Sequence, residues 1–480
     1  MVIVAEHGSG DVERAPRDAA EGVAEQVLGT LEDNLPFKPK GKKLASIAWR
    51  TWVYSDTGPQ RTRYGYLRAG ALTDIRGPEI KNAGCQGGWY RVNPRGFVCV
   101  GKGATLDTSH PLVIESSVRP VRGKALPYLY AMSAEQAPYR YFRLPSIEEI
   151  MVVEGRDVMT HAAVWRERAQ RTGLRDLIGE PASPPDFLRT VRRLHKPYGV
   201  KTGLYYSVHS GQSSPDAGFA LARTFIWEDR EYGLSTELDV LALDRLKLVE
   251  PTAFHGVALE EGEGLPVAFM EQRYSRRFTH TDAGFVASEP LRYREGVKLT
   301  GQSEPGGFLE TRSGDYVAEM GARLIPPRDS FPSFATGDRK WIDISIKRQS
   351  LVAYMGKRPV YATLVSTGRG GLADPEKSHA TVRGTFMIHH KALSSTMDGD
   401  DDKSDSFNLL DVPFVQYFHK GYALHGTYWH DEFGKERSHG CVNLAPVDAA
   451  WLFEWTDPQV PPDWHAALNK ERGTVVYIHA

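Results

Sequence analysis

Seven residues near the C-terminus constrain this chain more than any other feature: Ser438-His439-Gly440-Cys441-Val442-Asn443-Leu444. They place one cysteine beside a glycine and a histidine, and a second histidine, His425, ends an apolar run upstream. A thiol is a poor nucleophile until a base removes its proton, so a cysteine within reach of a histidine suits acyl transfer. A glycine beside the cysteine lets a substrate carbonyl approach and leaves backbone N–H groups for an oxyanion. The string therefore favours a catalytic cysteine over a buried structural thiol.

The order of His425, a short loop and Ser438-His439-Gly440-Cys441-x-Asn443 resembles the active-site signature of the L,D-transpeptidases of bacterial cell walls, the YkuD-type catalytic domain. Upstream, residues 381–386 (Thr-Val-Arg-Gly-Thr-Phe) resemble the family's Thr-Pro-x-Gly-x-Phe segment, with valine at the proline place. The loop of residues 426–437 is slightly shorter than is usual in the family. Asn443 stands where many relatives carry arginine, and it would attract a carboxylate less strongly than a guanidinium.

The resemblance implies a role for each residue of the signature. Cys441 is the expected nucleophile, His425 its base, and the backbone carbonyl of Gly426 the group that orients the imidazole. We expect the N–H groups of Gly440 and Cys441 to bind the oxyanion, and His439 to polarise the site or hold the loop.

Four residues are expected to contact substrate or shape the loop: Ser438, Asn443, Tyr428 and Trp429. The aromatic and acidic loop Tyr428–Phe433 would suit stacking on a sugar or receiving a cationic amine, and it would equally suit a packed hairpin. His430 is an alternative base, which its loop position disfavours.

The reaction implied by the resemblance is acyl transfer in two steps without ATP. Cys441 attacks the carbonyl after the third, diamino-acid residue of a peptidoglycan stem and expels the terminal D-Ala, and an amine of another stem then takes the acyl group. Water as acceptor would make the enzyme an L,D-carboxypeptidase, and a lysine of an envelope protein would make it an anchoring enzyme. A non-catalytic peptidoglycan-binding module and a cytosolic cysteine hydrolase are the alternatives from other classes.

Charge and composition exclude several other functions. The formal net charge of −1 gives no electrostatic case for nucleic acid or for a polybasic membrane patch. No apolar run approaches the roughly 18 residues of a membrane span. No signal peptide is visible, because Met1–Ala5 is too short an apolar stretch. The resemblance nevertheless implies the cell envelope or periplasm.

We expect no metal and no cofactor. The acidic run Asp398–Asp402 lacks the ligand spacing of an EF-hand loop. His389 and His390 are neighbours on a predicted strand, where successive side chains face opposite ways. Residues 199–203 lack the glycine and lysine order of a phosphate loop.

Three cysteines divide into a pair and a single residue. Cys85 and Cys99 lie close in sequence and Cys441 far from both, which fits one disulfide and one reactive thiol in an oxidising compartment. Two reduced, buried thiols are the alternative.

At 480 residues the chain exceeds what one core organises, and 41% hydrophobic residues indicate folded domains. We expect a mainly β protein that ends in an L,D-transpeptidase-type β-sandwich or barrel with a helix behind the cysteine. A weak echo between residues 88–98 and 307–317 resembles the last hairpin of a small bacterial Src-homology-type barrel, used twice. The expected parts are an N-terminal helix (Asp11–Leu31) and linker over 1–45, a small barrel over 46–106, a mixed α/β region with a helical insertion over 107–240, a second barrel over 241–330 and the catalytic domain over 331–480.

Local patterns predict several elements inside these parts. Helical spacing is found over 163–177, 187–194 and 446–455, and strand-like runs occupy 202–208, 220–227, 341–347 and 473–478.

Overall fold

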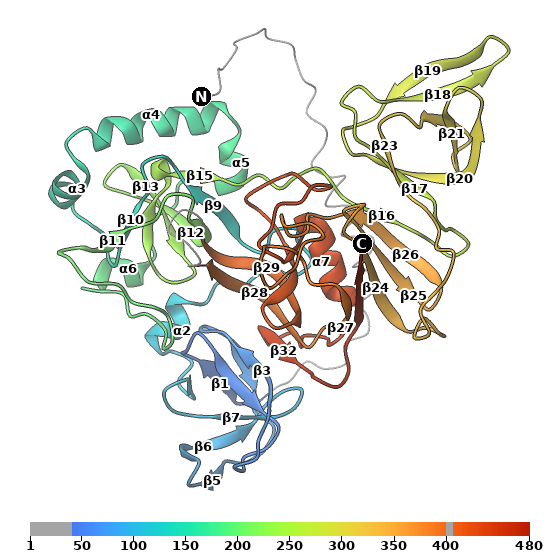
Figure 1. Cartoon of the computed structure of the whole chain (residues 1–480). Coiled ribbons are helices and arrows are strands. Elements are labelled where there is room, and N and C mark those ends of the chain that lie inside the picture. The colour runs from blue at the N-terminus through green and yellow to red at the C-terminus, as the bar shows by residue number, and fades with distance from the viewer. Residues whose placement is uncertain (1–40, 400–406) are drawn as a thin grey trace.

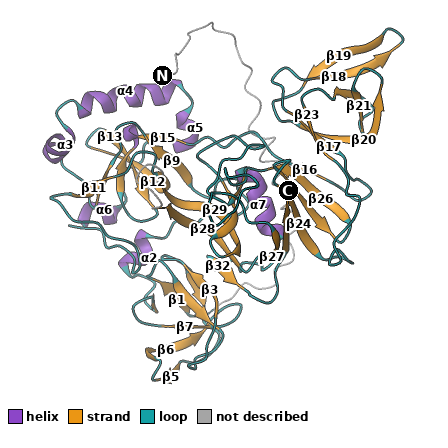
Figure 2. Cartoon of the chain, in the orientation of Figure 1, coloured by secondary structure: helices purple, strands orange, loops and turns teal. Residues whose placement is uncertain are grey.

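The computed structural model describes residues 41–399 and 407–480, which form a mostly β protein with few helices (Figures 1 and 2). Residues 331–480 lie at the centre of the molecule, with three smaller β units around them (Figure 1). The helix expected over Asp11–Leu31 lies outside the described residues, and so does most of the acidic run that follows Asp398.

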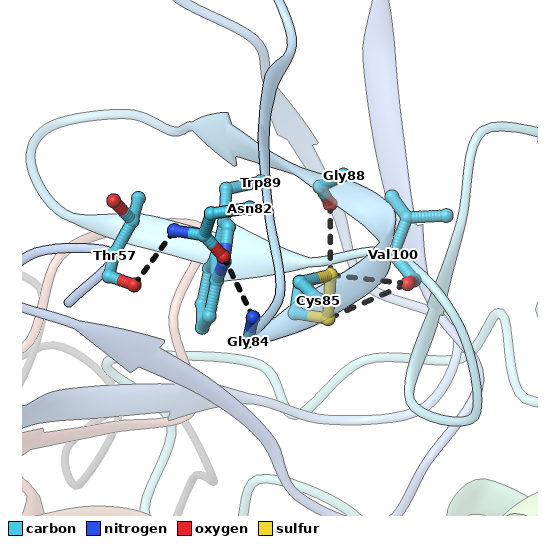
Figure 3. Close-up of a disulfide and its surroundings, with 8 residues drawn as sticks. Thr57, Asn82, Gly84, Cys85, Gly88, Trp89 and Val100 are labelled. Carbon is cyan, nitrogen blue, oxygen red and sulfur yellow. Dashed lines mark hydrogen bonds between the residues drawn. A yellow bond between two sulfur atoms is a disulfide. The ribbon is translucent and has the colours of Figure 1, made fainter. Parts of the chain in front are cut away.

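The first β unit consists of short strands closed by a disulfide. Cys85 and Cys99 are bonded, which settles the pairing that the sequence left open (Figure 3). Beside the disulfide, Trp89 is buried and its indole N–H donates to Asn82 Oδ1 at 2.9 Å. The strands are β1 (Lys43–Ser46), β2 (Thr51–Tyr54), β3 (Arg63–Leu67), β4 (Leu72–Asp74), β5 (Ile80–Asn82), β6 (Cys85–Arg91), β7 (Phe97–Cys99) and β8 (Ala104–Thr105).

The middle β unit carries most of the helices, which are inserted between its strands. Helix α2 (Pro111–Glu115) precedes it. Its strands are β9 (Leu129–Ser133), β10 (Tyr139–Tyr141), β11 (His209–Gln212), β12 (Gly218–Trp227), β13 (Arg230–Ser235), β14 (Val240–Ala242) and β15 (Leu246–Leu248). Its helices are α3 (Ile147–Glu154), α4 (Val158–Arg171), α5 (Leu174–Ile178), α6 (Asp186–Thr190) and the 3₁₀ helix η2 (Leu243–Arg245).

The third β unit has strands β17 (Val267–Met270), β18 (Arg276–Thr281), β19 (Gly284–Pro290), β20 (Gly296–Glu304), β21 (Phe308–Thr311), β22 (Tyr316–Ala318) and β23 (Ala322–Ile325). The hairpins β6–β7 and β21–β22 are the two segments whose sequences echo each other, and both are antiparallel pairs.

All three β units share one connectivity. In each, the first strand pairs with both a later strand and the last strand: β1 with β4 and β8, β9 with β12 and β15, β17 with β20 and β23. In each, the strand after the first pairs with the next-to-last strand: β2 with β7, β10 with β14, β18 with β22. The boundary expected at residue 240 therefore falls inside the middle unit, since β14 and β15 complete it. Residues 107–240 are not only an insertion; they contain most of this additional unit.

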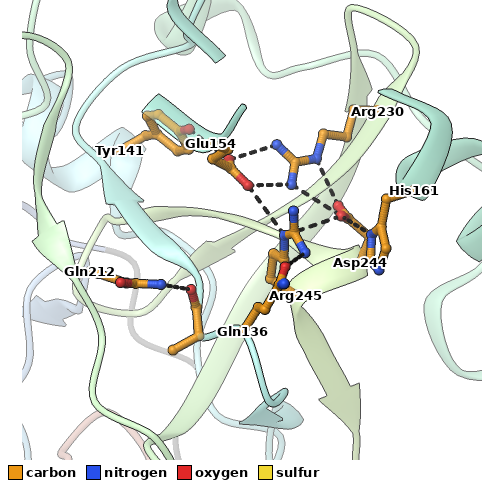
Figure 4. Close-up of polar contacts among 9 residues, drawn as sticks. Gln136, Tyr141, Glu154, His161, Gln212, Arg230, Asp244 and Arg245 are labelled. Atoms are coloured by element: carbon orange, nitrogen blue, oxygen red, sulfur yellow. Dashed lines mark hydrogen bonds and ion pairs between the residues drawn. The ribbon is translucent and has the colours of Figure 1, made fainter. Parts of the chain in front are cut away.

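A buried network of charges links the helices of the middle unit to its strands (Figure 4). Arg230, whose side chain is fully buried, donates to both oxygens of Glu154 at 2.7 and 2.8 Å and to Asp244 at 2.7 Å. Arg245 joins the same carboxylates and His161 bonds Asp244 at 2.9 Å. The buried charges are paired and hydrogen-bonded, as a low-dielectric interior requires.

The central domain consists of two sheets and one helix. One sheet has the order β16-β26-β25-β24-β33-β27. The other contains the long hairpin β28–β29, then β30, β31 and β32. The bounds are β16 (Val257–Ala258), β24 (Lys340–Ser345), β25 (Ser350–Met355), β26 (Arg358–Leu364), β27 (Gly384–Met387), β28 (His390–Gly399), β29 (Phe407–His419), β30 (Tyr422–Gly426), β31 (Val442–Leu444), α7 (Pro446–Trp455), β32 (Ala466–Leu468) and β33 (Val475–His479).

Helix α7 follows the cysteine segment directly and begins with proline at its first position, as its sequence predicts. Its apolar face packs between the two sheets in a core that contains Ile342, Leu424 and Phe453. Buried residues of the first β unit, such as Leu44 and Val53, belong to the same core.

One expected strand is wrong. Residues 202–207 form no regular element, and the strand begins only at His209. The backbone N–H of Tyr206 donates to His209 O at 2.9 Å, and the Leu204 side chain is exposed. An aromatic run without a neighbouring strand has no ladder to join, so propensity alone misleads here.

Candidate active site

Two parallel strands place Cys441 and His425 on one face of the sheet. In the pair β30–β31, Leu424 lies opposite Val442 and His425 opposite Asn443. Leu424 and Val442 face the central core, and Cys441 packs on the other side with Ala423. Because side chains alternate along a strand, His425 shares the face of Ala423 and Cys441.

The ring of His425 is held in the tautomer that a general base needs. Its Nδ1 lies 3.1 Å from the carbonyl oxygen of Gly426. A carbonyl only accepts, so Nδ1 carries the proton and Nε2 presents a lone pair. The ring is only 2% exposed, and burial lowers the pKa of His425 to about 4. It is therefore neutral and able to accept a proton at physiological pH. The Gly426 carbonyl thus occupies its expected position.

Cys441 is a thiol in this structure. Its side chain is partly exposed, and its sulfur lies 3.8 Å from the carbonyl oxygen of Gly421. Burial raises the pKa of the Cys441 thiol to about 11, and a hydrogen bond from the backbone of Ala423 opposes that rise. Within the described residues no hydrogen bond joins the sulfur to His425, and the raised pKa favours the thiol form of Cys441 at physiological pH.

The turn before Cys441 is shaped by Ser438 and Gly440. The Ser438 hydroxyl donates to the carbonyl of Cys441 and accepts the N–H of Gly440 at 3.0 Å. Gly440 has φ +122°, and a Cβ there would lie 2.7 Å from the ring of Tyr422. Both the conformation and the space require glycine. The N–H of Gly440 is used by Ser438, which leaves that of Cys441 as the candidate oxyanion donor of the two we expected.

His430 is not placed as a rival base. Its Nδ1 accepts the N–H of Glu432 at 3.3 Å, so its Nε2 carries the ring proton. Nδ2 of Asn443 lies 2.9 Å from that Nε2, while Oδ1 of Asn443 is buried with no partner among the described residues. Rotating the amide by half a turn pairs Oδ1 with the Nε2–H. Asn443 thus ties the 426–437 loop to β31.

Of the four residues expected to contact substrate, three are buried and one is partly exposed. Ser438, Asn443 and Tyr428 are buried and bonded within the protein. The ring of Tyr428 packs 4.4 Å from that of Tyr130 of the middle β unit. Trp429 is partly exposed, and its ring stacks on His425 at 5.7 Å. The packed alternative therefore holds for Tyr428, and Trp429 remains a candidate for substrate contact.

The acidic residues of the loop are neutralised. Asp431 accepts from Arg294 of the third β unit at 2.7 Å, and Glu432 pairs with Arg437. Each of these carboxylates therefore has a cationic partner within the protein.

His439 lies exposed at the rim of the site. Arg369 Nη2 lies 3.2 Å from its Nε2, and the rings of His379 and Phe407 lie 4.6 and 5.1 Å from its ring. These contacts put it in place to hold the loop before Cys441.

Comparison with known proteins identifies one domain of the chain. Residues 339–478 match the model of the YkuD family, described as the L,D-transpeptidase catalytic domain. These residues form a YkuD-type L,D-transpeptidase catalytic domain. A putative L,D-transpeptidase YciB of Bacillus subtilis is 25% identical over 140 residues, which are 24% of this chain and 59% of the relative. The chain thus spans a little over half the length of this curated relative.

Solved L,D-transpeptidase structures are similar to part of this chain. That from Xylanimonas cellulosilytica is 26% identical, with 31% of this chain and 65% of that chain covered and a TM-score of 0.21. That from Stackebrandtia nassauensis is 28% identical, with 31% and 60% covered and a TM-score of 0.21.

Three residues that contact the site of the YkuD domain could not be assigned to it from the sequence: Thr381, Tyr130 and Arg294. The Thr381 hydroxyl donates to Gly440 O and accepts the N–H of Gly368, both at 2.8 Å. Its position at the head of the Thr-Val-Arg-Gly-Thr-Phe segment was the available signal. Tyr130 and Arg294 come from other units and carry no local signal.

The described residues lack a metal cluster and a membrane-spanning helix. No group of three or more His, Cys, Asp or Glu side chains there could hold a metal. No helix in that part of the chain is long and apolar enough to cross a bilayer.

Proposed function

We propose that the protein is a cysteine-dependent L,D-transpeptidase that acts on peptidoglycan stem peptides in the cell envelope. The observation that carries the proposal is the position of His425: its Nδ1–H is held by Gly426 O, and its Nε2 lone pair lies on the face of the strand pair that carries Cys441. A YkuD domain supplies the reaction class.

The first step is acylation. Rotation of the Cys441 side chain into another staggered rotamer takes the sulfur from Gly421 O toward His425. His425 accepts the thiol proton as the sulfur attacks the carbonyl after the third, diamino-acid residue of the donor stem. The N–H of Cys441 stabilises the oxyanion. The proton then passes to the nitrogen of the terminal D-Ala, which leaves as the C–N bond breaks, and a thioester remains.

The second step transfers the acyl group. The side-chain amine of a second stem attacks the thioester, loses a proton to His425 and forms an amide, and the proton returns to the Cys441 sulfur. Water in place of the amine would make the enzyme an L,D-carboxypeptidase, and a protein lysine would make it an anchoring enzyme.

Purified wall fragments followed by mass spectrometry test the proposal. We expect a cross-linked product that has lost the terminal D-Ala of the donor stem. The Cys441→Ala variant should not form this product. Hydrolysed tripeptide alone would identify the carboxypeptidase. Intact-mass measurement with a carbapenem-type acylating agent gives a second test: labelling of Cys441→Ala at the wild-type level would remove Cys441 from the mechanism.

A further inference from the structure

The loop between the two catalytic residues is fixed partly from outside the YkuD domain. Arg294 lies between β19 and β20, in a tight turn where its φ is +63° and its N–H donates to Met270 O. Its side chain is 3% exposed and reaches Asp431 Oδ2 at 2.7 Å and Phe433 O at 3.4 Å.

The arginine is enclosed by aromatic rings. Its guanidinium carbon lies 4.9 Å from the centre of the Phe254 ring and 5.9 Å from that of Phe433. A desolvated cation among aromatic faces is attracted by their quadrupoles and keeps a defined orientation. A planar guanidinium with two acceptors in one loop is a rigid clamp.

The loop clamped in this way contacts both catalytic strands. Just before Asp431, Trp429 stacks on the ring of His425, and His430 is paired with Asn443, which lies opposite His425 in the strand register. A second arginine of the third β unit, Arg323, donates to Gly434 O at the end of the same loop.

We propose that Arg294 is a positioning residue for the Cys441–His425 pair and acts through residues 429–433. This inference rests on the proposed function. Neither Arg294 nor Arg323 lies within the matched residues 339–478, so the third β unit supplies part of the scaffold of the active site. Without the clamp, Trp429 leaves the His425 ring, water reaches the imidazole, and the geometry for proton transfer is lost.

The test is the kinetics of acylation of the full chain by a carbapenem, followed across pH. In Arg294→Met we expect the maximal acylation rate constant to fall about 10- to 100-fold, while the concentration for half-maximal rate changes little. Since hydration returns the His425 pKa from about 4 toward its ordinary value, the acidic limb of the profile moves to higher pH. Arg294→Lys keeps the charge next to Asp431 and recovers part of the rate.

Arg276→Met is the matched control. Arg276 belongs to the same β unit and donates through Nε to Ser288 O at 3.0 Å, a contact within that unit. This control variant should leave the acylation rate and the acidic limb of the pH profile unchanged. A variant that only loses stability would yield less active enzyme, but the acidic limb of its pH profile would stay at the wild-type pH.

The outcomes separate the two proposals. A wild-type chain that the carbapenem does not acylate would overturn the proposed function. If the wild-type chain is acylated and Arg294→Met matches it in acylation rate and in the pH of the acidic limb, this inference alone is overturned. Should Arg294→Met fail to fold, Asp431→Asn removes the same ion pair from the loop side. If Asp431→Asn then keeps the wild-type acylation rate and the wild-type acidic limb of the pH profile, the inference is overturned.

Discussion

The protonation states of Cys441 and His425 set how this site must work. With the pKa of Cys441 raised to about 11 and that of His425 lowered to about 4, the resting pair is thiol and neutral imidazole rather than thiolate and imidazolium. Neither group is charged across the physiological range. In the proposed mechanism, the base therefore takes the proton during attack on the substrate.

The pH profile of acylation follows from these states. His425 loses its ability to accept a proton only when its Nε2 is protonated, so we expect the acidic limb of the second-order acylation rate near pH 4 instead of near 6.5. Stopped-flow acylation between pH 3.5 and 9 measures it. An acidic limb near pH 6.5 would contradict the buried, neutral imidazole.

Gly440 provides a second prediction at this scale. Gly440→Ala introduces a Cβ 2.7 Å from the Tyr422 ring at a φ that L-residues rarely adopt, so the turn must shift and take the Cys441 N–H with it. We expect acylation to slow by about 100-fold, the effect typical of losing an oxyanion donor. Gly264→Ala is the control, since a Cβ there meets nothing within 4 Å. Equal rates for the two variants would show that the turn tolerates a side chain.

At the scale of elements, the disulfide between β6 and β7 stabilises the first β unit. Its cysteines are 14 positions apart, and a loop of that size contributes roughly 3 kcal/mol to the free energy of unfolding in the chain-entropy model. We expect Cys85→Ala/Cys99→Ala to lower the urea midpoint of the chain. Thiol titration of the denatured, unreduced wild type should give one thiol, that of Cys441. A titration of three thiols would mean that the pair is reduced in the protein.

Local signals explain which elements could be predicted. Helix α7 is found where the sequence places it, because proline at its first position and the apolar spacing lie within one segment. The middle β unit was missed because the helices α3–α6 separate β10 from β11, so its strands show no spacing typical of a small barrel. Arg294 could not be predicted as part of the site, since it bonds Asp431 across 137 positions of sequence.

At the scale of the whole molecule, all three β units contact the elements that carry the site. The third holds the loop through Arg294 and Arg323. The middle unit joins the hairpin β28–β29 through a parallel pairing of Gly218 with Leu409. The three units share one connectivity, and their contacts place each of them against the catalytic domain.

The first and middle units meet the catalytic domain at one buried carboxylate. Asp411 of β29 accepts from Arg68, which follows β3, at 2.5 and 2.7 Å and from the hydroxyl of Thr236 in the middle unit. Its carbonyl accepts from Tyr130 at 2.6 Å. Asp411 is fully buried with φ +50°, and Arg68 holds its pKa below the usual range despite burial.

Removing one partner of this pair is predicted to cost more than removing both. Arg68→Met leaves an uncompensated buried charge and should lower the free energy of unfolding by about 3–5 kcal/mol. Arg68→Met/Asp411→Asn removes both charges, and asparagine tolerates the positive φ, so the double variant should be more stable than Arg68→Met. Urea unfolding at pH 7 compares them with Lys201→Met, which removes an exposed partner of Asp398. A double variant no more stable than Arg68→Met would mean that the Asp411 charge is not what the arginine compensates, and that packing of the Arg68 side chain holds the units together.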